Sequence, residues 1–93
     1  MEPFNIRIMC GSEEVTLTIL PSDNGDFKII YYGGILGGVK KNGNNWDLLS
    51  PDQVAGEDLP LYEPRHGEDR IEIVLTDLIA DRIGDEIDLH FQD

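Results

Sequence analysis

The alternation of apolar and polar residues along the first half of the chain is the feature that most restricts its fold. Phe4, Ile6, Ile8 and Cys10 fall on one side of an extended segment, and the stretch VTLTI at 15–19 repeats the pattern. Side chains on one face of a β-strand recur with this period of two. With its turn residues, the pattern predicts five strands, near residues 4–10, 15–20, 27–32, 35–40 and 45–49. Short connections favour an antiparallel meander of neighbouring strands.

After the strands, the sequence SPDQVAG predicts one turn of helix. Ser50 is the expected N-cap, Pro51 suits the first helical position, Gln53 completes a capping box and Gly56 ends the turn. The following segment, EDLPLYEPRHGED, contains two prolines and is expected to run as an extended loop. Its apolar residues are expected to turn inward; they are Leu59, Leu61 and Tyr62.

The last quarter of the chain changes to a period near four. Apolar residues recur there at Ile71, Leu75, Ile79, Ile83, Ile87 and Phe91, with Val74 and Leu78 in the gaps between them. This stripe predicts an amphipathic helix from about residue 69 that passes or kinks at Gly84. We therefore expect one domain, residues 1–93, with an α+β fold: a five-stranded antiparallel β-meander packed on one face by a C-terminal amphipathic α-helix.

The charge of the chain excludes several classes of partner. There are 19 acidic and 7 basic residues, a net charge of −12. A protein that binds nucleic acid or an anionic membrane directly needs Lys and Arg to neutralise phosphates, so neither is an expected partner. The N-terminal sequence lacks the basic start and apolar stretch of a secretory signal. With a single cysteine and no disulfide framework, these features predict a cytoplasmic protein.

The stretch GGILGGVKKNG at 33–43 resembles a phosphate-binding loop only in composition. A P-loop requires Lys directly after its second glycine and then Ser or Thr, but Val39 follows Gly38 and no hydroxyl is in place. We interpret the stretch as a hairpin strand. Gly33-Gly34 is expected to form its first turn and Asn42-Gly43 its second. Gly37 and Gly38 are expected where another part of the chain, first of all the C-terminal helix, packs closely.

The chain contains few residues suited to metal binding or nucleophilic catalysis. The acidic turn DNGD at 23–26 does not match an EF-hand, because Lys28 stands where the loop needs glycine. Cys10, His66 and His90 show no metal-ligand spacing and no cofactor motif accompanies them. They still define one hypothesis, a small enzyme or metal-dependent domain that uses Cys10 with His66 or His90.

Two surfaces are predicted to bind a partner. Asp77, Asp81 and Asp85 form a row at four-residue spacing, and Asp88 follows three residues later. Like charges at this spacing oppose helix formation, although Glu86 is expected to offset part of that by pairing with Arg82. The second surface is the outer sheet face, whose apolar residues exceed what a solvated face needs. They are expected either to lie under the proline-containing loop or to contact a partner. The predicted contact residues of this face are Ile30, Tyr32 and Leu36.

The sequence therefore favours a non-enzymatic protein-interaction module over an enzyme. Its partner is expected to be a protein, and a basic one if the acidic row is the binding surface. An inhibitor or immunity-type protein that imitates the charge of nucleic acid is a special case of this hypothesis. A homodimer through the outer sheet face is a further alternative.

Overall fold

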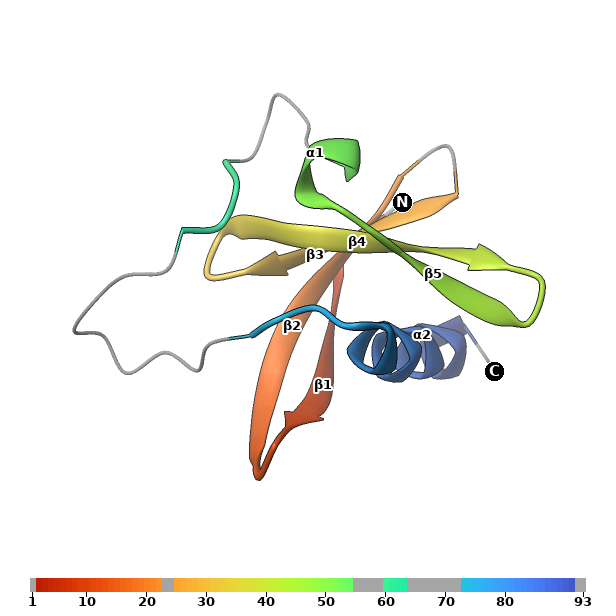
Figure 1. Ribbon diagram of the computed structural model, residues 1–93, viewed down its shortest axis with the longest axis horizontal. Coiled ribbons are helices and arrows are strands. Elements are labelled where there is room, and N and C mark those ends of the chain that lie inside the picture. Colours follow the sequence, from red (N-terminus) through yellow and green to blue (C-terminus); the bar gives the residue numbers. More distant parts are fainter. Residues whose placement is uncertain (1, 23–24, 55–59, 64–72, 92–93) are drawn as a thin grey trace.

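Five antiparallel strands form one curled sheet, and a C-terminal helix packs on it (Figure 1). This architecture confirms the predicted α+β fold. The structure, a computed structural model, describes residues 2–22, 25–54, 60–63 and 73–91. Its elements are β1 (Phe4–Cys10), β2 (Glu13–Pro21), β3 (Asp26–Tyr31), β4 (Gly34–Asn42), β5 (Asn45–Leu49), α1 (Pro51–Val54) and α2 (Asp77–Phe91).

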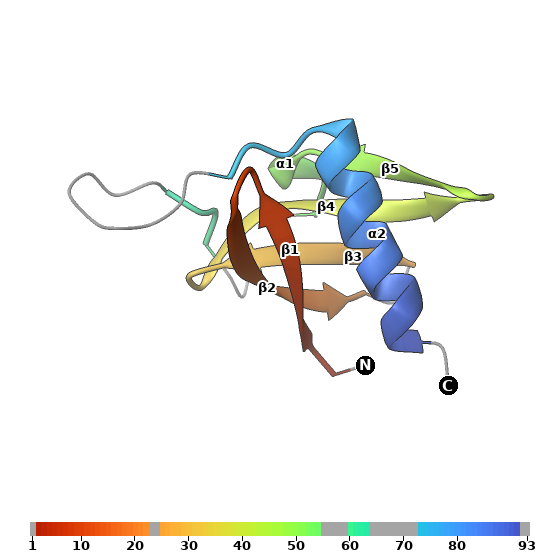
Figure 2. The same ribbon diagram turned by 90° about the horizontal axis from the view of Figure 1, so that it is seen from below.

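Helix α2 spans the open side of the curled sheet. The strands pair in the order β1-β2-β3-β4-β5, so β1 and β5 are the edge strands. Helix α2 contacts both of them, and it runs in front of the sheet between them in Figure 2. The short helix α1 packs on β4 from the other side (Figure 1). Because exposed sheet edges promote association with further strands, a helix beside β1 and β5 protects the sheet.

The core lies between the sheet and α2. Its strand residues follow the predicted alternation, with every second side chain of β1 and β2 directed inward. Removing these side chains from water is the main force that holds helix and sheet together. The buried core cluster consists of Ile6, Ile8, Val15, Leu17, Ile19, Ile29, Tyr31, Val39, Trp46, Ile73, Ala80, Ile83 and Ile87.

A bulge reverses the predicted directions of two side chains in β4. Ile29 pairs with Gly37 but Ile30 pairs with Ile35, so Leu36 has no partner on β3. Leu36 consequently packs against the core cluster, whereas Ile35 is buried outside it. The sequence had predicted Leu36 on the outer face, and strict alternation from there would have placed its neighbour Ile35 inward. One extra residue in a strand shifts the alternation of every residue beyond it, and this explains the error.

The turn between β3 and β4 also lies one residue earlier than predicted. Tyr32 and Gly33 occupy it with φ of 49° and 79°, the positive values that a two-residue type I′ turn requires. Gly34 is therefore the first residue of β4. Residues 60–63 lie against this part of β4. The Ile35 N–H donates to the carbonyl of Pro60, and the N–H of Tyr62 donates to the carbonyl of Ile35, each at 2.9 Å.

Both helices begin with side-chain caps. In α1 one half of the expected capping box forms, since the N–H of Ser50 donates to Oε1 of Gln53 at 2.8 Å, whereas the N–H of Gln53 donates to the backbone carbonyl of Ser50 at 3.0 Å. Helix α2 begins at Asp77, because Thr76 Oγ1 accepts the N–H of Ile79 at 3.2 Å. The prediction of a helix from about residue 69 is wrong for residues 73–76, which are not helical, and residues 69–72 lie outside the described part of the chain.

The predicted apolar stripe of the last quarter is only partly buried. Ile83 and Ile87 are fully buried, and Ile79 is half-buried. In contrast, Val74 and Leu78 are 65% and 61% exposed, and Phe91 is also exposed. Val74 precedes the helix, so the helical periodicity that placed it in the stripe does not apply to it. Ile71 lies outside the described residues.

Helix α2 continues through Gly84 without interruption as far as Phe91. Gly84 is buried, and the ring of Trp46 occupies the position that its Cβ would take. The glycine thus allows the helix to approach β5 closely. Gly37 and Gly38 serve other contacts: an added Cβ would lie 2.8 Å from Leu75 at Gly37 and 2.7 Å from Val54 at Gly38. The close neighbours of these two glycines are therefore α1 and the segment before α2, not α2 itself as predicted.

We expect Gly84→Ala to destabilise the protein even though alanine is the better helix former. Helix propensity would contribute about 1 kcal/mol in favour of the variant. Overpacking against the indole ring costs more, and we expect a net loss of about 1–3 kcal/mol in the free energy of unfolding. Urea denaturation followed by circular dichroism measures this difference.

Trp46→Ala supplies the control background, because it removes the ring atoms that the added methyl group would meet. In that background the same Gly84→Ala change should cost less than half as much. An equal cost in both backgrounds would show that Trp46 is not the reason for the glycine.

Candidate functional site

The predicted acidic row lies on α2, but only three of its four residues are exposed to solvent. Asp77, Asp81 and Asp85 are exposed and make no ion pair within the described residues. Asp88 is half-buried, and its Oδ1 accepts a hydrogen bond from Nζ of Lys41 at 2.9 Å. That Nζ also lies 5.5 Å from the centroid of the Trp46 ring. Asp88 therefore belongs to the contact between α2 and the sheet.

The side of α2 that faces away from the sheet carries two exposed leucines. Leu78 and Leu89 are 61% and 59% exposed. At about 100° per residue they fall on one side of the helix, with Arg82 and Asp85 between them. We call these four residues the outer face of α2. This face was not predicted from the sequence, because Leu78 fits the apolar stripe and no role was predicted for Leu89.

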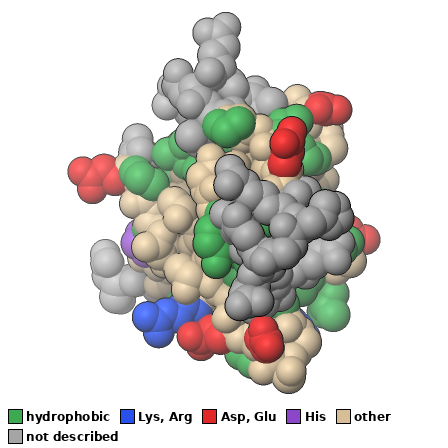
Figure 3. Space-filling view, turned by 90° about the vertical axis from the view of Figure 1, so that its left-hand side faces the viewer, with side chains coloured by type: hydrophobic (Ala, Val, Ile, Leu, Met, Phe, Trp, Pro, Cys, Tyr) green, Lys and Arg blue, Asp and Glu red, His purple; other side chains and the backbone are tan. Residues whose placement is uncertain are grey.

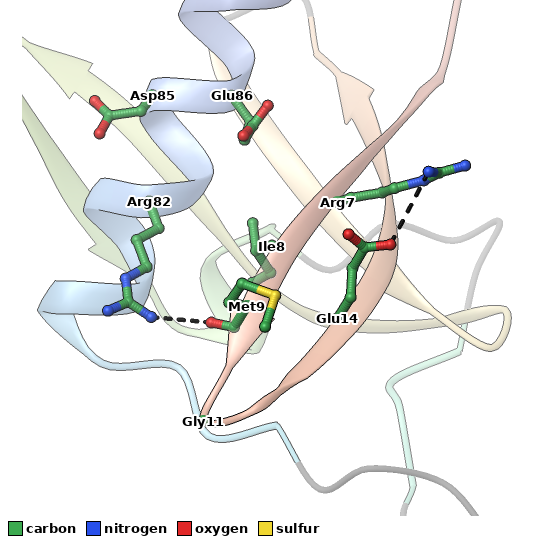
Figure 4. A pocket seen from close by; sticks show the side chains of 8 residues that line it. All are labelled: Arg7, Ile8, Met9, Gly11, Glu14, Arg82, Asp85 and Glu86. Atoms are coloured by element: carbon green, nitrogen blue, oxygen red, sulfur yellow. Dashed lines mark hydrogen bonds and ion pairs between the residues drawn. The ribbon is translucent and has the colours of Figure 1, made fainter.

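A shallow groove separates α2 from the β1–β2 hairpin (Figure 4). It has a volume of about 590 Å³. Nη1 of Arg82 donates to the carbonyl of Met9 at 2.9 Å, and Arg7 lies 4.0 Å from Glu14 on the neighbouring strand. The lining residues are Arg7, Ile8, Met9, Gly11, Glu14, Arg82, Asp85 and Glu86.

The hydrogen bond to Met9 replaces the interaction predicted for Arg82. The helical spacing predicted an ion pair between Arg82 and Glu86, and no such pair forms within the part of the chain that the structure describes. Arg82 instead connects α2 to the backbone of β1. The groove brings together two guanidinium groups and three carboxylates, but no histidine or hydroxyl side chain, so it lacks an evident nucleophile–base pair.

Cys10 and His90, two of the three residues of the enzyme hypothesis, lie far apart. Cys10 ends β1, whereas His90 stacks on Phe4 at its beginning, with 3.7 Å between ring centroids. Six residues of strand separate these positions by about 20 Å. His66 lies outside the described residues. In the described ranges, no three residues among His, Cys, Asp and Glu are grouped as a metal ion would require.

Cys10 is half-buried at the margin of the core cluster. Burial raises the pKa of its thiol above the usual value, and the positive charge of Arg82 opposes this rise in part. A raised pKa leaves less thiolate at neutral pH, and the thiolate is the reactive form. The environment of Cys10 therefore lowers the fraction of reactive thiolate at neutral pH.

The three residues predicted on the outer sheet face do not form one surface. Ile30 is half-buried opposite Ile35, and Leu36 packs against the core cluster. Tyr32 is exposed at the β3–β4 turn, with its ring 4.6 Å from that of Tyr31. On the side of the molecule seen in Figure 3, the coloured hydrophobic side chains form separate patches. The homodimer through this face stays a prediction.

Comparisons with protein-family models, with curated proteins and with solved structures gave no match. Among the helices of the described residues, none has the length and apolar character needed to cross a membrane.

We expect the Cys10 thiol to react with iodoacetamide more slowly in the folded protein than in the urea-unfolded chain at pH 8. The folded pKa is the higher one, so less thiolate is present. By the same linkage, the thiol stabilises the fold below its unfolded pKa, and this contribution is lost as pH rises through the folded pKa. Alkylation rates measured from pH 7 to pH 10 test the difference.

Arg82→Gln should slow the reaction further, because it removes the charge that opposes the rise in pKa. Arg7→Gln removes a charge from the same groove and serves as the matched control. A folded thiol that reacts as fast as the unfolded one would contradict the raised pKa.

Proposed function

We propose that this protein is a non-enzymatic interaction module that binds a basic protein through the acidic row of α2. The observation that carries the proposal is the row itself, Asp77, Asp81 and Asp85, exposed along one helix and without an ion pair among the described residues. The net charge of −12 gives long-range attraction for a positively charged partner and accelerates encounter.

The energetics of α2 support a role outside the fold. Carboxylates four residues apart destabilise a helix by about 0.2–0.5 kcal/mol per pair. The N-terminal end of the helix dipole favours Asp77, but Asp81 and Asp85 lie beyond its first turn. Lys or Arg side chains of a partner, placed along the row, would offset the repulsion between these aspartates.

Apolar side chains beside the row fit the same proposal. Leu78 and Leu89 are exposed on the neighbouring side of α2. Protein interfaces combine an apolar centre with a polar, often charged rim. The expected partner segment is therefore basic and amphipathic, with apolar residues for the two leucines and Lys or Arg for the row. An inhibitor that imitates nucleic acid charge is the special case in which this partner is a nucleic-acid-binding protein.

A fluorescent amphipathic helical peptide of Leu and Lys is the probe that tests the row. Asp77→Asn, Asp81→Asn and Asp85→Asn together should weaken its binding by on the order of tenfold at 50 mM salt, about 1.4 kcal/mol. The difference from wild type should shrink as salt rises, since exposed charges are screened. Fluorescence anisotropy titrations give both dissociation constants.

The matched control removes three exposed carboxylates elsewhere, through Glu13→Gln, Glu14→Gln and Asp52→Asn. Both triple variants have the same net charge, so the comparison separates the position of the charges from their number. Equal weakening in the two variants would show attraction to the overall charge alone and would end the proposal of a binding row.

A further inference from the structure

The outer face of α2 is self-complementary under a twofold rotation. Leu78 and Leu89 are equally far from the point midway between Ile83 and Gly84, and so are Arg82 and Asp85. When two copies of a helix pack antiparallel about such a midpoint, residues equally far from it on either side face each other. Leu78 would then meet the second copy's Leu89, and Arg82 would meet its Asp85.

We propose that the outer face of α2 binds a second copy of this chain as an antiparallel helix pair. Isologous contacts of this kind, in which one patch meets itself, are the commonest form of oligomerisation. The contact would hold two reciprocal Arg82–Asp85 ion pairs at its centre. At each end it would bury one Leu78 against one Leu89, about 16 Å apart along each helix.

The positions of these side chains in the structure make the contact accessible. Leu78 and Leu89 are 61% and 59% exposed, and Arg82 and Asp85 are exposed between them. Helix α2 lies at the surface along its whole length, in front of the sheet in Figure 2. Arg82 donates one bond to the carbonyl of Met9 through Nη1, and this leaves its other nitrogens available to a carboxylate of the second copy.

The antiparallel arrangement also determines where the remaining acidic residues of α2 lie. A twofold axis perpendicular to both helices places the same flank of the two copies on the same side of the pair. Asp77 and Asp81 of both copies therefore lie together on one flank of the pair, outside the leucines. Their mutual repulsion makes the association weak at low salt. The arrangement also brings Asp77 and Asp81 of both copies together as one acidic surface. Because the pair uses Leu78, Leu89 and Asp85, self-association would compete with a basic amphipathic partner for these three residues.

Sedimentation equilibrium of the full chain at 0.3 M salt tests the proposal. A contact made by one helix face is small, and small interfaces associate with dissociation constants from about 10 µM to 1 mM. The average mass of the wild-type protein should rise toward twice that of the monomer over this concentration range. Wild-type protein that stays monomeric at 1 mM overturns the proposal.

Charge exchange tests the orientation of the two helices. Asp85→Arg alone and Arg82→Asp alone should each weaken self-association at least fivefold, because each places like charges at the centre. The two single variants, mixed in equal amounts, should associate with each other as well as the wild type does, since opposite charges then face one another. A mixture that remains monomeric contradicts the antiparallel arrangement, and circular dichroism verifies that both variants are folded.

Two further variants separate this contact from others. Leu89→Ser should weaken self-association at least fivefold, whereas Val74→Ser, a matched change at an exposed apolar position outside α2, should leave it unchanged. Equal effects of the two changes would overturn the assignment of the interface to α2. Asp77→Asn with Asp81→Asn should preserve or strengthen the pair while weakening peptide binding, so this proposal and the proposed function can fail independently.

Discussion

The contact between Gly84 and the Trp46 ring is the constraint on which the arrangement of helix and sheet depends. Trp46 projects from an edge strand, and Gly84 lets α2 come close enough for the ring to cover the helix backbone. The same approach brings Asp88 within hydrogen-bonding distance of Lys41. On the opposite side of the helix, Arg82 reaches the backbone of β1. The helix is thus joined to both edges of the sheet, and its orientation determines which residues remain outside.

Much of the fold could be predicted from the sequence, because its strands have a buried face and an exposed face. In β1 and β2 the alternation is unbroken, and the inward residues Ile6, Ile8 and Leu17 are buried as expected. The alternation does not reveal a bulge, since an extra residue such as Leu36 changes which side chains point inward without changing composition. The periodicity that marked the last quarter similarly does not reveal the cap at Thr76 that starts α2.

The candidate site was harder to predict, because exposure depends on packing between distant segments. The acidic row was visible as a spacing in the sequence. Asp88 pairs with Lys41 and so is not part of the exposed row. This pairing depends on where β4 lies relative to α2. Leu78 shows the same limitation: its position fits the apolar stripe, yet the helix is rotated so that Ala80, Ile83 and Ile87 face the core instead. A three-residue spacing alone does not distinguish the margin of a buried stripe from its outside.

The charged residues of α2 fall into two groups, those that stabilise the fold and those that do not. Asp88 and Arg82 each have a partner on the sheet, so their charges stabilise the position of the helix. Asp81 and Asp85 have no such partner within the described residues, and their mutual repulsion opposes the helix that carries them. Leu78 and Leu89 beside them also contribute little to the core, so the fold does not depend on these four side chains. The two proposed contacts, with a basic partner and with a second copy of the chain, would each give these exposed side chains a role.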